Sequence, residues 1–149
     1  MYARQLAWFN ATPRPPDTAK KVSAPAPKVS RGEEFIARGG RPLFPDVGDA
    51  EYIIAYWFDL GKIQSGGMGA APLSALEISA WMTASGLCLA PWEFRVLRRM
   101  SEAYLAQLHE SEKPECPPPY GNPVQIVDRN EVSKKVGNAF RALIQAKRK

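Results

Sequence analysis

The sequence has little of the chemistry that enzymes and metalloproteins use. It contains two cysteines, Cys88 and Cys116, and one histidine, His109, and these stand at no metal-ligand spacing. His109 has no partner placed to form a nucleophile pair, so we interpret it as a surface residue. Cys88 lies in an apolar turn and is expected to be a small buried residue. The sequence therefore predicts no enzymatic activity, no metal and no cofactor.

Long apolar runs and strand signals are also scarce. No run approaches the roughly twenty apolar residues that a membrane span needs, and the first ten residues are too polar for a signal peptide. We therefore expect a cytosolic protein with no membrane contact. Only residues 124–127 favour a strand. The glycine-rich stretch 61–72 lacks the Lys-Ser/Thr ending and the preceding strand of a phosphate-binding loop, so no nucleotide site is expected.

Proline and charge divide the chain of 149 residues. The prolines cluster within 13–45 and 114–123, and the two ends are basic whereas the middle is acidic. Basic ends suit nucleic acid or acidic protein surfaces, and we favour protein because the only tight basic run is Lys147-Arg148-Lys149. Four parts are predicted: an extended basic, proline-rich N-terminal arm (1–45), a helical core (46–113), a proline-rich spacer (114–127) and a C-terminal amphipathic helix (128–149).

The N-terminal arm carries large apolar residues near its tip. Its prolines favour polyproline II conformation, and its lysines keep it solvated. A disordered tail is the simpler interpretation of such a composition. Leu6, Trp8 and Phe9 favour the alternative, in which the arm anchors in a groove of another protein. Within the arm, residues 31–39 are consistent with one short helix that ends at a pair of glycines.

The middle of the chain has the apolar spacing of helices with clear ends. Residues 50–60 place their aromatic and aliphatic side chains on one face, after Asp49 as a capping residue. Residues 74–85 begin with a capping box, Ser74 and Glu77, and end at a glycine. The stripe expected to be buried on this second helix comprises Leu73, Leu76, Ala80, Trp81 and Ala84.

A third helix is predicted over 91–112 and forms a helix–turn–helix hairpin with the second. Its start, Pro91-Trp92-Glu93-Phe94, is apolar and acidic, so sequence-specific DNA binding is not expected. Arg95, Arg98 and Arg99 lie mostly off its apolar stripe, as a solvated face or as a patch for an acidic partner. A core this small cannot bury every aromatic residue. The candidate partner contacts in the middle are Tyr56, Trp57, Trp92 and Arg99.

The C-terminal helix, within 128–149, is basic and amphipathic. The proline-rich spacer sets its distance from the core. The helix either folds back on the core or lies on another molecule, and the sequence leaves both open. Phe140 on its apolar face is a candidate contact in the second case. The fold class predicted for the whole chain is all-α: a small helical bundle with a helix–turn–helix hairpin, an extended arm and a tethered last helix.

Residues 50–108 combine three motifs. These are an aromatic helix, EYIIAYWFDLG, then P-L-S-x-x-E-I-x-A-W, then S-G-x-x-L-x-P-W-E followed by L-R-x-M-S-x-A-Y-L. In this order they resemble the small tail assembly chaperones of tailed bacteriophages. The resemblance covers half of the chain or less. The residues that carry it are Pro72, Ser74, Glu77, Ile78, Trp81, Gly86, Leu89, Pro91, Trp92, Glu93, Leu97, Ser101, Tyr104 and Leu105.

The resemblance implies a role in phage morphogenesis. Such chaperones are thought to coat a long helical tape measure protein and to bring tail-tube subunits to it. The expected partners are therefore tape measure or tail-tube protein, in the host cytoplasm during assembly, and a homo-oligomer is also compatible with the sequence. One alternative is a virion structural protein whose terminal arms lace between neighbouring subunits of the particle. Another is a non-viral adaptor whose segment Pro13–Pro16 binds an SH3-like groove.

Overall fold

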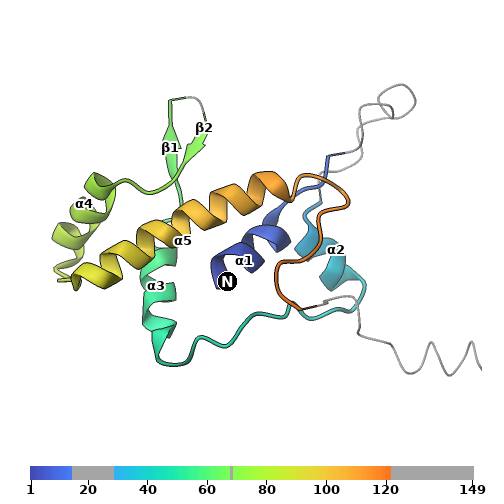
Figure 1. The fold of residues 1–149 in the computed structure, drawn as a ribbon, viewed down its shortest axis with the longest axis horizontal. Coiled ribbons are helices and arrows are strands. Elements are labelled where there is room, and N and C mark those ends of the chain that lie inside the picture. Colours follow the sequence, from blue (N-terminus) through green and yellow to red (C-terminus); the bar gives the residue numbers. More distant parts are fainter. Residues whose placement is uncertain (15–28, 68, 122–149) are drawn as a thin grey trace, which may run out of the picture.

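The computed structural model describes residues 1–14, 29–67 and 69–121, which form a mostly helical protein with one small β-hairpin (Figure 1). The predicted helical character is confirmed, and the structure adds a small two-strand hairpin that was not predicted. The predicted C-terminal helix lies outside the described residues. The elements in chain order are α1 (Tyr2–Asn10), α2 (Arg31–Ala37), a 3-10 turn (Gly48–Ala50), α3 (Glu51–Asp59), β1 (Gln64–Gly66), β2 (Gly69–Ala71), α4 (Ala75–Ser85) and α5 (Pro91–Glu110).

The long helix α5 is the scaffold of the fold, because α1 and α3 both pack against it (Figure 1). It begins at Pro91, whose missing N–H would have no partner in the first turn of a helix. The Glu93 carboxylate accepts a hydrogen bond from the backbone N of Ala90 at 2.6 Å, which fixes that turn. Leu97 and Tyr104 are buried seven residues apart on one side of the helix, as the apolar spacing predicts.

The helices before α5 begin and end at residues with clear roles. At the start of α4, Ser74 Oγ accepts a hydrogen bond from the backbone N of Glu77 at 3.1 Å, as the capping pattern predicts. Gly86 ends α4 in the left-handed region, with a φ of 68°. The predicted cap of α3 is wrong. Asp49 lies in the 3-10 turn and its side chain caps neither that turn nor α3, and the turn itself leads into the helix.

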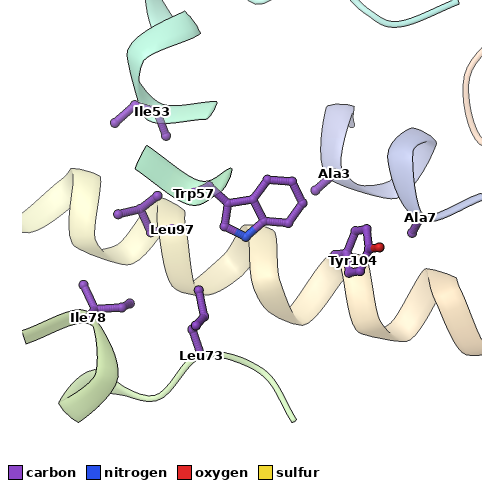
Figure 2. Close-up of a cluster of buried hydrophobic side chains, with 8 residues drawn as sticks. All are labelled: Ala3, Ala7, Ile53, Trp57, Leu73, Ile78, Leu97 and Tyr104. Atoms are coloured by element: carbon purple, nitrogen blue, oxygen red, sulfur yellow. The ribbon is translucent and has the colours of Figure 1, made fainter. Parts of the chain in front are cut away.

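Trp57 of α3 lies at the centre of the main core (Figure 2). Its side chain is 0% exposed, and its ring centroid lies 5.4 Å from that of Tyr104 in a T-shaped arrangement. Its Nε1 donates a hydrogen bond to the carbonyl oxygen of Lys62 at 3.1 Å, which ties the end of α3 to the turn after it. The other buried members of this core are Ala3, Ala7, Ile53, Leu73, Ile78 and Leu97.

Residues 1–14 do not form the predicted extended arm. The helix α1 packs along α5, and Trp8 and Phe9 are buried. Trp8 Nε1 donates a hydrogen bond to the carbonyl oxygen of Cys116 at 2.9 Å. The reason is the size of the core, since the central helices alone cannot cover the apolar side of α5 near its C-terminal end. Residues 15–28 of the predicted arm lie outside the described residues.

A second buried cluster joins residues 29–45 to α1. Phe35 of α2 and Phe44 pack against Phe9, with ring-centroid separations of 5.8 and 5.6 Å. The predicted short helix in this segment is confirmed as α2, and Ser30 caps its first turn. The prediction that residues 29–45 belong to an extended arm is therefore wrong.

The predicted spacer also packs on the core over its described part, residues 114–121. Cys116 is buried, and the backbone N of Tyr120 donates a hydrogen bond to Gln5 Oε1 at 3.0 Å. The prolines here, which lack backbone donors, lie in a segment that is hydrogen-bonded to α1 through Cys116 and Tyr120. The predicted core boundaries, 46–113, are consequently too narrow at both ends.

The glycine-rich stretch forms the hairpin that sequence reasoning missed. Strands β1 and β2 pair antiparallel, with Gln64 opposite Ala71. Gly66 permits this close pairing, because a Cβ there would lie 2.9 Å from the carbonyl oxygen of Gly69. Gln64 Oε1 accepts a hydrogen bond from the backbone N of Ser74 at 2.9 Å, so the hairpin positions the start of α4.

The stripe predicted to be buried at α4 is confirmed only in part, because Leu73 is buried and Trp81 partly buried but the other three residues are exposed. Ile78 is the buried residue of α4, whereas Leu76 is 79% exposed and Ala80 and Ala84 are also exposed. The helix is apolar nearly all round, so its spacing did not specify one face. Cys88, in the turn after α4, is exposed and not buried as predicted.

The hydrogen bond from Tyr52 Oη to Glu93 Oε1, at 2.6 Å, joins α3 to α5 and predicts a pH dependence. It raises the pKa of Tyr52 from 10.0 to about 12 and lowers the pKa of Glu93, with the Ala90 amide as the second cause of the Glu93 shift. The contribution of Tyr52 to stability is therefore present below pH 10.0 and lost as the pH rises through about 12. That of Glu93 is lost as the pH falls through its lowered pKa.

Ultraviolet absorbance of tyrosinate measures this effect. Tyr52→Phe is expected to remove the ionisation step near pH 12. The control Tyr120→Phe, which removes a tyrosine far along the chain, is expected to leave that step in place. Burial also raises the pKa of Tyr2, so the amplitude is decisive: an unchanged absorbance gain near pH 12 in Tyr52→Phe would contradict the assignment.

Candidate functional site

An apolar groove lies between α1, α3, α5 and the loop before α3. Its volume is about 540 Å³, within the range of about 300–1,000 Å³ that is usual for binding pockets. The first turns of α1 and α3 form two sides, the loop around Pro45 forms a third, and α5 from Trp92 to Ala103 forms the fourth. The main apolar residues that line it are Tyr2, Val47, Ile54, Trp92, Val96 and Met100.

The α5 side of the groove carries one regular stripe. Trp92, Val96, Arg99 and Ala103 follow one another at four, three and four residues, so they share one face of the helix. At 1.5 Å per residue this stripe is about 16 Å long. Trp92 is 50% exposed despite its large apolar ring. Tryptophan and arginine are the residue types that most often dominate protein–protein binding energy.

Positive charge borders the groove on two sides. Arg4 lies on α1, where its Nε donates a hydrogen bond to Gln107 Oε1 at 2.8 Å. Arg99 lies on α5 and forms no ion pair with any residue that the structure describes. Among the described residues, Asp46 provides the one carboxylate that lines the groove, and its Oδ1 accepts a hydrogen bond from the backbone N of Gly48 at 3.0 Å.

The structure brings two of the predicted contact residues together, since Trp92 and Arg99 both line this groove. Two others are partly buried elsewhere. Tyr56 packs against Trp81 with ring centroids 5.5 Å apart, and Leu6 packs against the main core. Neither of these two lines the groove.

Three predicted contacts are wrong because their side chains belong to the interior. Trp57 is fully buried in the main core, and Trp8 and Phe9 are buried in the second cluster. The rings of Trp8 and Phe9 cover apolar surface that the predicted core, residues 46–113, could not cover alone, and the ring of Trp57 fills the centre of that core. Phe140 lies outside the described residues.

Sequence reasoning missed most of the groove lining. Val96 and Met100 follow Trp92 at four and eight residues, and this second apolar stripe on α5 was a usable signal. Tyr2 and Val47 had no comparable signal, because they reach the groove only through the packing of α1 and the loop before α3.

Among residues 1–14, 29–67 and 69–121, no group of three His, Cys, Asp or Glu side chains is placed to hold a metal ion. No helix in the described part of the chain is long and apolar enough to cross a membrane. Comparison with protein-family models, curated proteins and solved structures found no match to this chain.

Proposed function

We propose that this protein binds a helical segment of another protein in the α1–α3–α5 groove, as a tail assembly chaperone-like protein of bacteriophage morphogenesis. The binding role is carried by one observation: exposed Trp92 shares a single apolar groove with Arg99, which forms no ion pair with another described residue. The phage role rests on the resemblance of residues 50–108. The partners proposed are tape measure or tail-tube protein, met in the host cytoplasm during assembly.

The residues that carry the resemblance to tail assembly chaperones fall into two groups, those that stabilise the fold and Trp92, and the second supports a binding role. Ser74 caps α4, and Ser101 Oγ accepts a hydrogen bond from the backbone N of Leu73 at 2.8 Å. These residues are explained by the fold itself. Trp92 is not, because half of its side chain remains in solvent. An amphipathic helix laid into the groove would bury the rest of the indole.

The alternative, a virion structural protein that laces between subunits, requires residues 1–30 to extend outward. Helix α1 instead uses residues 2–10 within the core, so we place this alternative second. Mass spectrometry of purified particles separates the two. The protein at subunit stoichiometry in the particle would contradict a transient chaperone.

Affinity purification of the tagged protein from infected cells tests the proposal. We expect tape measure or tail-tube protein to co-purify. Trp92→Glu is expected to lower the recovery about tenfold, because it places a charge in an apolar groove. Leu76→Glu makes the same kind of change at an exposed position on α4 and is expected to retain full recovery. Equal recovery with both variants would contradict the groove as the binding site, and absence of phage tail proteins would contradict the phage role.

A further inference from the structure

We infer that the groove receives an amphipathic helix of about three turns whose apolar stripe is flanked by Asp or Glu side chains. This inference rests on the proposed function and deepens it, since it gives the chemistry of the bound segment. It follows from the length of the groove, the charge on its borders, and the composition of the only other obvious occupant.

The length of the groove sets the length of the segment. The stripe from Trp92 to Ala103 covers twelve residues of α5, or about 16 Å from end to end. A helix that lies alongside this stripe matches it with about three turns, and its apolar residues then recur every three to four positions. Trp92 at one end of the stripe and Met100 near the other provide large apolar surfaces for two such turns.

The charge at the borders of the groove determines which side chains are favoured on either side of the apolar stripe of the bound segment. Arg4 and Arg99 stand on two different sides of the groove, on α1 and α5. A helix between them would bring its polar flanks toward both guanidinium groups, and carboxylates there would form ion pairs. The third charged residue, Asp46, already accepts the Gly48 amide and lies on the loop side. Two arginines against one aspartate favour an acidic segment over a basic one.

The C-terminal segment of the same chain is the obvious competitor. It carries an apolar series that includes Val136 and Phe140, and its charged residues are mostly basic, with the run Lys147-Arg148-Lys149 at its end. If this segment lay in the groove, its lysine side chains would be repelled by the guanidinium groups of Arg4 and Arg99. The charge therefore favours a segment from another protein.

Fluorescence anisotropy on the full-length protein tests the inference with three labelled peptides. Two are designed helices with leucine at i, i+4 and i+7, one flanked by glutamate and the other by lysine. The third has the sequence of residues 128–149. We expect the glutamate peptide to bind about tenfold more tightly than the lysine peptide at low ionic strength, with a ratio that falls as salt screens the charges. The third peptide is expected to bind no more tightly than the lysine peptide.

Two adjacent arginines provide matched variants. Arg99→Glu is expected to reverse the order of the two designed peptides. Arg98→Glu makes the same charge change about 100° further round α5, at a residue that does not line the groove, and is expected to preserve the order. A thermal melt of each variant confirms that it is folded.

The outcomes separate this inference from the proposed function. Equal binding of the glutamate and lysine peptides, tighter binding of the 128–149 peptide, or no binding of any peptide would each overturn the inference. A Trp92-dependent co-purification of tail proteins would stand in all three cases, because it does not depend on the flanking charges.

Discussion

Trp57→Ala is expected to lower the free energy of unfolding by about 3–5 kcal/mol, the usual cost of deleting a buried aromatic side chain. The indole is fully buried between α3, α5 and α1, so its removal leaves a cavity that all three helices border (Figure 2). It also leaves the carbonyl oxygen of Lys62 without its donor. Because small domains have only about 5–15 kcal/mol of stability, this loss is a large part of the total. Urea unfolding followed by circular dichroism measures it.

Trp92→Ala is the matched control, since the same residue type is removed from a half-exposed position on the groove. We expect it to cost about 1 kcal/mol or less of stability while it weakens partner binding. Both tryptophans were predicted as partner contacts, whereas in the structure Trp57 is fully buried and Trp92 is half exposed. Similar losses of stability in both variants would contradict the burial that distinguishes them.

Deletion of residues 1–10 is expected to abolish the cooperative unfolding transition. This deletion removes α1 from the side of α5, together with the hydrogen bond of Trp8 to Cys116 and those of Gln5 to Leu43 and Tyr120. The burial of Phe9 alone contributes about 1.5–3 kcal/mol. Thermal melts by circular dichroism measure the effect. An extended arm would make the deletion harmless, so an unchanged melt would refute the packing of α1.

A pair of point variants tests the same packing in the full-length chain. Ala7→Glu places a carboxylate on the fully buried face of α1 and is expected to destabilise severely, because a buried charge has no partner there. Arg4→Glu places the same side chain on the exposed face and is expected to cost only about 1 kcal/mol, mainly through the bond to Gln107. Equal losses of stability in the two variants would contradict the structure, in which Ala7 is buried and Arg4 is exposed.

Local sequence signals predicted the helices well where a residue's chemistry acts within one turn. The proline that begins α5, the serine that caps α4 and the glycine that ends α4 each act on the backbone beside them. Local sequence signals did not predict which face of a helix is buried where several of its faces were equally apolar. Helix α4 offered two apolar faces, and the one with Leu76 lies in solvent while the one with Ile78 is buried.

The candidate site was predictable only in part, for a related reason. Trp92 and Arg99 were found because their residue types favour binding. Nothing local showed that they would share a groove with Tyr2 and Val47, which are distant in the chain. Proline content near both ends suggested extended segments, yet the described parts of those segments pack on the core.

The sequence by itself determined the helical character of the protein, the start of α5 and both ends of α4, because these follow from neighbouring residues and their spacing. Only the tertiary structure decided which aromatic residues are interior and which line the groove. The physical reason is that burial depends on how much apolar surface remains uncovered after the elements meet. Here the central helices left one side of α5 open, and α1 with the segment 114–121 covers it.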